Sequence, residues 1–570
     1  MKLSQLAGGG GPGRLAGQLA GRVVTQVTNQ VGAMLVLAGT GVARPVRPDR
    51  ALGMGLAVVR WGVTPAAGLA AGAARYPDDT AVVDDLGPLT YRQMDEMSSA
   101  IATGLRQRGV VDGAKVGVLL RNSRWFLLSL AALAKAGADV VLLNTGFGAG
   151  QLGDVCVREG VSALVLDEEF EGLLGSAPAE LLRVIAYADD DSGGTARASG
   201  TAGTGGTRTR TTRTTLAELA TTRPSIGRPS HQSKVVILTS GTTGTPKGAP
   251  RGATGGVEPA AAILSGIPLK ARGRTVIAAP LFHSWGMAHL GLALLLSSTI
   301  VVTRTFDPEK VLKLVEQHKA NALAVVPVMM SRMLELDPQV RARYDTSSLK
   351  VVAASGSKLP GDLSSDFMDA FGDVVYNLYG STEVAYATVA SPRDLREAPG
   401  TAGRVLMGTT IQLIGADGNE VPRGQIGRIF VGNPLLFEGY TGGEDKDRLG
   451  GLMASGDIGR FDDAGRLFIE GRDDEMIISG GENVYPGEVE ELLAKHPRIR
   501  EVAVVGVDDA TMGQRLVAHV VPKGDLTAEE VKAHVKDKLA RHKVPRDITF
   551  LDELPRNATG KVLKRELGTS

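Results

Sequence analysis

Short apolar segments of strand length alternate with helical segments from Thr80 onward, and this alternation constrains the fold more than any other feature. We expect strands over residues 116–120, 138–143 and 163–166, with a helix over residues 126–136. Another helix should begin after Thr90, whose hydroxyl is suited to cap it. This spacing is typical of parallel α/β units, in which each helix connects two strands of one sheet.

The size of the chain, 570 residues, exceeds what one compact core accommodates, so we expect at least two domains. Hydrophobic residues make up 43% and charged residues 22%, as in ordinary globular proteins. The net charge of +1 gives no positive field that would favour a nucleic-acid partner. A single cysteine, Cys156, excludes a disulfide framework and a cysteine-based metal cluster. We therefore expect a cytoplasmic protein.

The segment Ile237-Leu-Thr-Ser-Gly-Thr-Thr-Gly-Thr-Pro-Lys-Gly248 follows an expected strand over residues 235–238. Its glycines let the backbone turn tightly and present N–H groups to an anion, while the hydroxyls and one lysine add donors and charge. The lysine lies between proline and glycine, which differs from the standard P-loop. A flexible turn is the alternative, but the order and density of these residues favour polyphosphate binding. The candidate residues are Thr239, Ser240, Gly241, Thr242, Thr243, Gly244 and Lys247.

A second motif, Tyr379-Gly-Ser-Thr-Glu383, ends another expected strand over residues 374–379. With the Gly/Thr loop, it resembles the adenylate-forming superfamily, which includes acyl-CoA synthetases, aryl-CoA ligases, peptide-synthetase adenylation domains and luciferases. The resemblance implies that Tyr379 stacks on adenine, Thr382 contacts the α-phosphate and Glu383 holds Mg²⁺. A magnesium ion bound by few carboxylates and by substrate phosphates agrees with this role. Taken alone, the Thr-Glu pair could merely open a helix.

Further nucleotide-binding residues follow from the same resemblance. Ser455-Gly-Asp457 resembles the ribose-binding motif, in which a carboxylate accepts the ribose hydroxyls, and Arg472 supplies the matching arginine. Asp474 falls at the hinge between the large and small domains of the family. Small residues at two strand ends would let a flat base approach the backbone. We expect these to be Ser355, Gly356, Ser357, Asn377 and Gly380.

Two motifs beyond the hinge resemble parts of the family's small domain. Gly480 and Gly481 belong to a segment similar to the loop that lines the pantetheine tunnel of CoA. Asn483 stands where members often carry a basic residue, which leaves the CoA phosphates without an assigned partner. Lys561 closes the segment Leu554-Pro-Arg-Asn-Ala-Thr-Gly-Lys561, similar to the family's catalytic-lysine motif. The resemblance implies that the catalytic residues are Lys561, Thr242, Thr382 and Glu383.

An apolar segment over residues 279–286 contains one histidine and one tryptophan and could form the wall of an apolar acid pocket. His283 matches the family position that bounds the acyl group, although a lone histidine is more often structural. Trp285 resembles, more weakly, the acyl-tunnel gate of some fatty-acyl members. We expect Gly356 and Gly380 to line the same pocket. A metal site at His283 and His289 is rejected, because no acidic third ligand lies near in the sequence.

Residues 1–75 lie outside the resemblance and carry eight Lys or Arg but one acid, Asp49. Apolar residues recur at helical spacing between residues 18 and 37, and no apolar run reaches the ~20 residues of a spanning helix. Peripheral membrane contact through residues 1–60 and a helix packed on the enzyme body both remain open. Residues 192–215 contain only Ser, Gly, Thr, Ala and Arg, so we expect a disordered surface insertion.

The expected fold is α/β, with a large N-terminal domain of parallel sheets plus a β-rich subdomain, and a small, mobile α+β C-terminal domain. We expect an N-terminal extension over residues 1–75, an AMP-binding domain over residues 76–472 and the small domain over residues 473–570. The extension allows two locations, free in the cytoplasm or peripheral at the inner face of the membrane. A homodimer is a further possibility that the sequence leaves open.

The expected function is an ATP-dependent acyl-CoA synthetase that activates a fatty acid as acyl-AMP and transfers it to CoA, with Mg²⁺. The apolar wall and the lack of an acidic counter-charge favour a fatty acid. An aryl or short acid, or a carrier protein as acceptor in place of CoA, remain alternatives. A membrane-docked binding protein with a degenerate nucleotide site is the alternative of another class.

Overall fold

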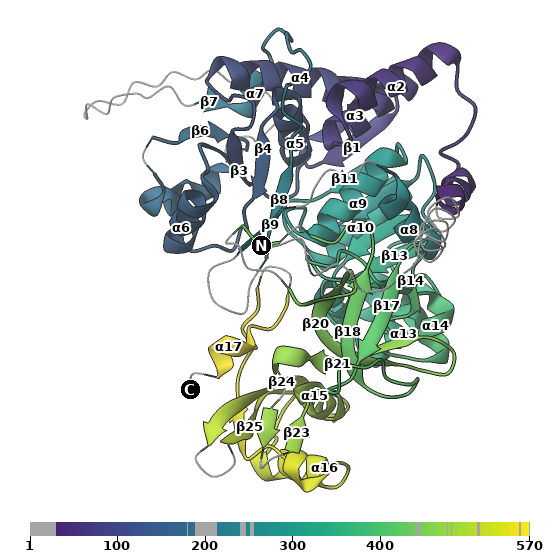
Figure 1. Cartoon of the computed structure of the whole chain (residues 1–570), viewed down its shortest axis with the longest axis vertical. Coiled ribbons are helices and arrows are strands. Elements are labelled where there is room, and N and C mark those ends of the chain that lie inside the picture. Colours follow the sequence, from purple (N-terminus) through teal and green to yellow (C-terminus); the bar gives the residue numbers. More distant parts are fainter. Residues whose placement is uncertain are drawn as a thin grey trace, which may run out of the picture.

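The computed structural model describes residues 30–178, 180–187, 214–239, 247–250, 256–437, 439–441, 446–475, 477–479, 482–509, 513–557 and 560–568. A large body of sheets and helices lies above a smaller C-terminal domain (Figure 1). Several predictions fall outside the described residues. These are residues 1–29, the insertion up to residue 213, the loop residues Ser240, Gly241, Thr242, Thr243 and Gly244, the glycines Gly480 and Gly481, and the side chains of Thr239, Lys247, Asp474 and Asn483.

A seven-stranded sheet contains the strands predicted from the alternating pattern. Its strands are parallel except for the last, which returns antiparallel beside β8 and places Lys247 opposite Thr239. The insertion predicted over residues 192–215 extends too far at its C-terminal end, because Thr214 and Thr215 pair with β6 as strand β7. The strand order is β7 (Thr214–Thr215), β6 (Leu182–Ile185), β5 (Ala163–Leu166), β3 (Lys115–Leu119), β4 (Asp139–Leu142), β8 (Val235–Thr239) and β9 (Lys247–Pro250).

A nine-stranded sheet forms the second half of the large domain. Six of its strands are parallel, and antiparallel strands close both edges. The order is β16 (Arg404–Val405), β15 (Thr388–Ala390), β14 (Val375–Tyr379), β13 (Val351–Ala354), β12 (Ala322–Val325), β10 (Arg274–Ile277), β11 (Thr299–Val302), β1 (Thr80–Asp84) and β2 (Gly87–Thr90).

A layer of helices lies between the two sheets and forms the main core. Every residue of α5 (Arg124–Ala136) is buried, because this helix contacts strands of both sheets. The charge on Lys135 is satisfied there by Asp95 and two serines of α4 (Tyr91–Gln107). Thr90 caps α4 as predicted, in a capping box with Gln93. The other large-domain helices are α6 (Ala149–Glu159), η1 (Glu168–Ser176), α7 (Leu216–Leu219), α8 (Glu258–Gly266), α9 (Ser284–Leu295), α10 (Pro308–His318), α11 (Pro327–Glu335), α12 (Pro338–Arg341), α13 (Gly361–Phe371) and α14 (Pro392–Glu397).

A β-rich unit follows the nine-stranded sheet, as expected for the large domain. Figure 1 shows it in green between the large sheets and the small domain. Strands β20 and β21 pair so that Asp457 lies opposite Arg472. Its strands are β17 (Thr410–Ile414), β18 (Gly427–Gly432), β20 (Leu452–Phe461), β19 (Arg448–Leu449) and β21 (Leu467–Arg472).

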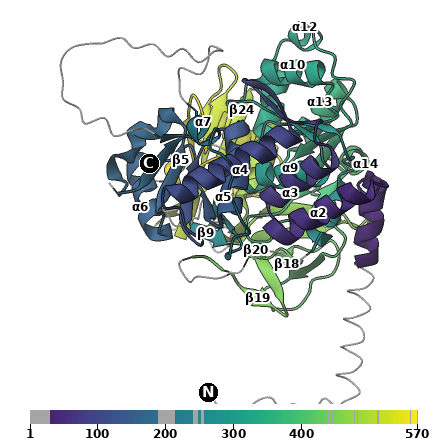
Figure 2. The ribbon, with the colours of Figure 1, turned by 90° about the horizontal axis from the view of Figure 1, so that it is seen from above.

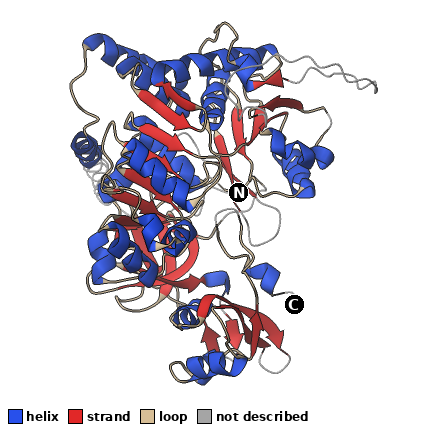
Figure 3. Cartoon of the chain, turned by 180° about the vertical axis from the view of Figure 1, so that it is seen from behind, coloured by secondary structure: helices blue, strands red, loops and turns tan. Residues whose placement is uncertain are grey.

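The small C-terminal domain is an α+β unit, so the predicted fold class is confirmed. Its two long strands, β24 and β25, pair antiparallel, and Thr527 caps α16 in a capping box with Glu530. After η3 (Asp473–Glu475) come β22 (Ile477–Ser479), β23 (Glu482–Val484), α15 (Pro486–Ala494), β24 (Ile499–Asp509), β25 (Gly513–Pro522), α16 (Ala528–Lys536), η4 (Arg541–Lys543), β26 (Asp547–Phe550) and α17 (Lys564–Leu567). Figure 3 shows its helices and sheet from behind.

The described part of the N-terminal region is helical. Residues 30–40 form one helix, followed by α2 (Pro48–Trp61) and α3 (Pro65–Arg75). α3 belongs to the main core, and α2 packs across its outer side (Figure 2). The helical body of the large domain therefore begins before residue 76, with α3 in its core. Among the described residues, no helix combines the length and apolar character needed to cross a bilayer.

Candidate active site

A cavity of about 670 Å³ lies between the large and small domains. Its floor contains the carboxyl ends of β13 and β14, where a parallel sheet commonly places ligand-binding residues. Predicted residues far apart in sequence meet in it. They are His283, Trp285, Ser355, Gly356, Ser357, Asn377, Tyr379, Gly380, Thr382, Glu383, Asp457, Arg472 and Lys561.

Tyr379, Asp457 and Arg472 form a connected group on one side of the cavity. The Tyr379 hydroxyl donates to Asp457 Oδ2 over 2.7 Å, and Arg472 Nη1 donates to Oδ1 over 3.2 Å. Burial, reinforced by the charge of Asp457, raises the pKa of Tyr379 well above its usual value, so the hydroxyl stays protonated. Burial also raises the pKa of Asp457, while Arg472, Tyr379 and Lys561 oppose that shift. The carboxylate is thus held in place and retains acceptor capacity for ribose hydroxyls.

Glu383 is held by a hydroxyl on each carboxylate oxygen. Ser381 Oγ donates to Oε2 over 2.8 Å, and the Tyr440 hydroxyl donates to Oε1 over 2.7 Å. Tyr440 is itself fixed by an edge contact with the ring of Phe437, at 4.8 Å between centroids. The described residues contain no cluster of three potential metal ligands. One oriented carboxylate fits Mg²⁺ that is held mainly by substrate phosphates and water.

The segment after Tyr440 joins Glu383 to the strand that follows the predicted phosphate loop. Thr441 N–H donates to the carbonyl of Gly248 over 2.9 Å, and Thr441 Oγ1 donates to buried Glu159 over 3.0 Å. A Cβ at Gly248 would lie 2.9 Å from both Thr441 and Glu159. A glycine at this position therefore permits the close approach that fixes the start of β9.

The wall predicted for the acyl group is rigid and neutral. Trp285 is buried, its Nε1 donates to the carbonyl of Val325 over 3.0 Å, and its ring meets His289 edge-on. His283 is the N-cap residue of α9, and its Nε2 has no hydrogen-bond partner among the described residues. Burial lowers the pKa of His283 and of His289 to about 4, so both rings are neutral near pH 7.

The small domain inserts Lys561 into the cavity. Lys561 N–H donates to Asn557 Oδ1 over 2.9 Å, which closes the turn that carries the lysine. Gly560 has a φ of +77°, and a Cβ there would lie 2.3 Å from Val328 of α11. Only glycine therefore lets this turn press against the large domain. The described lining of the cavity includes Lys561 but not residues 477–479, which precede Gly480.

Lys564, one turn further along the chain, ties the turn that carries Lys561 to other parts of the small domain. Its Nζ lies 2.9 Å from Glu475, next to the predicted hinge, and 2.9 Å from Glu490 of α15. Burial alone would lower the pKa of Lys564, but the two carboxylates outweigh it and the pKa is raised. Lys358 of the large domain also pairs with Glu491 of α15 over 3.3 Å.

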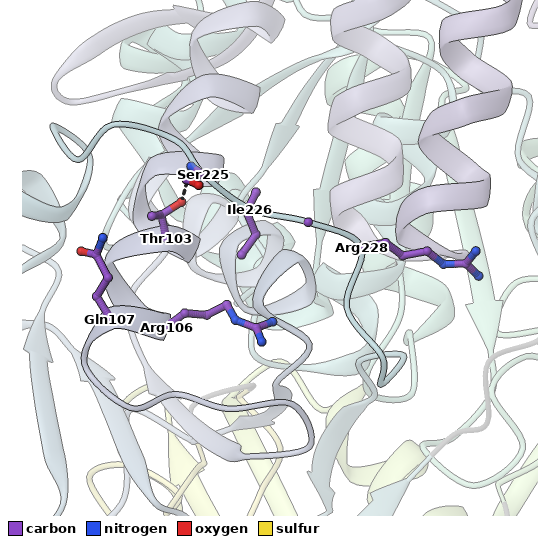
Figure 4. Close-up of a pocket in the computed structure, with 7 residues that line it drawn as sticks. Thr103, Arg106, Gln107, Ser225, Ile226 and Arg228 are labelled. Carbon is purple, nitrogen blue, oxygen red and sulfur yellow. Dashed lines mark hydrogen bonds between the residues drawn. The ribbon is translucent and has the colours of Figure 1, made fainter.

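A separate hollow of about 460 Å³ lies between the last turns of α4 and the loop over residues 225–228 (Figure 4). Thr103 accepts a hydrogen bond from Ser225 N–H there, and Arg106 is paired with Asp112 over 2.8 Å. The charge of Arg106 is compensated, and the hollow contains none of the predicted site residues. The cavity between the domains is therefore the candidate active site.

Several cavity residues escaped the sequence analysis. Ser381 stood at the variable position of a recognised motif. Ser455 was quoted without a role, although beside the cavity its Oγ lies 3.1 Å from the Tyr379 hydroxyl and accepts from Asp457 N–H. Tyr440 and Lys446 carried no motif at all, and only the tertiary structure brings them to the cavity. Lys564 could have been suspected from its position three residues after Lys561.

Comparisons with known proteins agree with this geometry. Residues 69–441 match the family described as AMP-binding enzyme, and residues 488–561 match the AMP-binding enzyme C-terminal domain. The chain is 32% identical to a 2-succinylbenzoate–CoA ligase of Bacillus cereus strain AH820, covering 86% of this chain and 95% of the relative. It is 32% identical to a feruloyl-CoA synthase of Amycolatopsis, covering 86% and 96%.

A solved structure is similar over nearly its whole length. The o-succinylbenzoate CoA synthetase of Bacillus subtilis, in complex with an acyl-adenylate intermediate, superposes with a TM-score of 0.75 at 25% identity, covering 88% of this chain and 98% of that one. The chain belongs to the AMP-binding enzyme family and is an AMP-forming acid–thiol ligase. ATP, a carboxylic acid and CoA are its substrates.

Proposed function

We propose that this acid–thiol ligase activates an aryl or similarly compact carboxylic acid, rather than a long-chain fatty acid. The fixed ring of Trp285 carries the proposal, because it bounds a cavity that must accommodate AMP as well as the acyl group. Trp285 limits the far wall, since its hydrogen bond to Val325 and its contact with His289 hold the ring in place. The aromatic acids in the names of two relatives support the same choice. The alternative of the sequence analysis is thus better supported than its fatty-acid preference.

In the first half-reaction, the substrate carboxylate attacks the α-phosphorus of ATP, and pyrophosphate leaves. Catalysis of phosphoryl and nucleotidyl transfer depends mainly on positioning and on charge stabilisation. Lys561 would neutralise negative charge at the α-phosphate, with Thr382 as a hydroxyl partner. Asp457 and Tyr379 would hold ribose and adenine, and the Gly/Thr loop with Lys247 would hold the leaving pyrophosphate.

Glu383 would contribute the one protein carboxylate to Mg²⁺, which supplies charge neutralisation on the phosphates when it is bound. Ser381 and Tyr440 orient this carboxylate before any ligand arrives. Because the described residues contain no group of three potential metal ligands, binding of the ion should depend on the nucleotide.

In the second half-reaction, the CoA thiolate attacks the acyl carbon and AMP leaves. Lys561 then has no further role, and we propose that rotation about Asp474 exchanges it for the loop that contains Gly480 and Gly481. The contacts of Lys564 with Glu475 and Glu490 lie beyond Asp474, so they would move as one unit with the small domain in this step.

A CoA-ligation assay over a panel of acids tests the proposal. We expect kcat/KM for 2-succinylbenzoate, ferulate or another aryl acid to exceed that for twelve- to sixteen-carbon fatty acids by at least about tenfold, because one pocket mismatch costs about 1–3 kcal/mol. The opposite order would refute the aryl assignment without affecting the family. Pyrophosphate exchange with an acid that forms no CoA thioester would instead indicate a carrier-protein acceptor.

A further inference from the structure

The outer side of α2 presents apolar side chains to solvent without any polar residue between them. Residues 51–59 of this helix contain only Ala, Leu, Gly, Met and Val. Leu52, Leu56 and Val59 recur at the spacing of one helical face and are 65%, 57% and 62% exposed. A helix that faced only water would normally carry charged or polar residues at these positions.

The preceding helix, over residues 30–40, repeats this property. Val31, Met34 and Leu35 are exposed, and no charged residue occurs in this helix. Half of the exposed large hydrophobic side chains of the described residues fall between Val31 and Val63. A concentration of this kind marks an interaction surface rather than the scattered apolar exposure of any protein. We call it the N-terminal apolar surface: Val31, Met34, Leu35, Leu52, Leu56, Val58, Val59 and Val63.

Arginines border this surface at both ends of α2. Arg47, which pairs with Asp49 over 3.2 Å, and Arg50 lie at its start, and Arg60 lies at its end. Asp49 is the single acid of residues 1–75. Arg60 donates to the carbonyl of Ile226, which brings the loop that carries exposed Arg228 to the same end of the helix. An apolar face bounded by arginines complements the acyl boundary and the anionic headgroups of a phospholipid bilayer.

We propose that the N-terminal apolar surface docks the enzyme on an anionic phospholipid bilayer, lying in the interface without crossing it. A second copy of the chain is a poorer partner, because a two-fold contact would bring the same arginines together. The small domain lies at the opposite end of the molecule from α2, so docking leaves its movement free (Figure 1). The segment before residue 30 adds three basic residues and no acid to this end of the chain.

Sedimentation of the full chain with vesicles tests the proposal. Vesicles of phosphatidylglycerol and phosphatidylcholine should bind the protein, and vesicles of phosphatidylcholine alone should bind it several-fold less. The double variant Leu52→Gln/Leu56→Gln should lower binding by at least about tenfold, since two exposed leucines no longer enter the apolar boundary. The matched control is Val111→Gln/Val157→Gln, two exposed valines elsewhere, which should bind as the unmodified chain does.

An unchanged melting temperature in both variants shows that the comparison is made on folded protein. Binding of the leucine variant at the level of the unmodified chain would overturn the proposal, as would an equal loss in the valine control. Vesicle binding absent from the unmodified chain, together with a dimer that the leucine variant converts to monomer, would assign the surface to a second copy instead.

Discussion

Replacing Tyr440 by Phe should impair acyl-AMP formation while leaving the fold intact. The change removes only the hydroxyl that donates to Glu383 Oε1 over 2.7 Å, and it keeps the ring contact with Phe437. A hydrogen bond to a charged group contributes about 1.5–3 kcal/mol. Tyr440 is half-buried, so we use the lower half of that range, which corresponds to a loss of roughly 13- to 45-fold in kcat/KM.

The assay is ATP–pyrophosphate exchange with a saturating aryl acid, read alongside CoA-thioester formation from supplied acyl-AMP. Only the exchange reaction should fall, because the orientation of Glu383 matters while the phosphates are held. The control is Tyr344→Phe, which removes a similar bond to Glu309 over 2.8 Å on α10, away from the cavity. Exchange within twofold of the unmodified enzyme in both variants would refute the view that Tyr440 orients Glu383.

Two further predictions use other parts of the cavity. Lys561→Ala should lower the rate of acyl-AMP formation by about 10²–10³-fold, as expected for the loss of one charge-stabilising donor. The variant should still convert supplied acyl-AMP to acyl-CoA. An equal loss of both half-reactions would contradict the exchange of Lys561 for the loop that contains Gly480 and Gly481. Burial lowers the pKa of His289 from 6.5 to about 4. As the pH falls, the unfolded chain therefore binds a proton at this histidine before the folded chain does. The free energy of unfolding should decrease as the pH falls from about 6.5 to 4. His289→Leu should reduce the pH dependence of the free energy of unfolding between pH 6.5 and 4, measured by urea unfolding, by up to about 1.4 kcal/mol per pH unit. An unaltered pH dependence would show that the histidine does not titrate in this range.

Many local features could be predicted from the sequence because their causes are local. Hydrophobic periodicity located β3, β4, β5 and β8 to within two residues, and the hydroxyl cap at Thr90 is where its side chain predicted it. The motifs also placed Tyr379, Asp457 and Lys561 in one site, since a fixed order of motifs limits the possible folds. The roles of these residues remain proposals.

The tertiary structure decided what depends on neighbours distant in sequence. Tyr440 reaches Glu383 across 57 residues, and Thr441 reaches Glu159 across 282, so no local pattern could reveal either contact. The position of α3 inside the core also required the layer between the two sheets, because an alanine-rich helix carries little periodicity. The sequence by itself thus determined the elements and the chemical groups, whereas packing determined which of them meet.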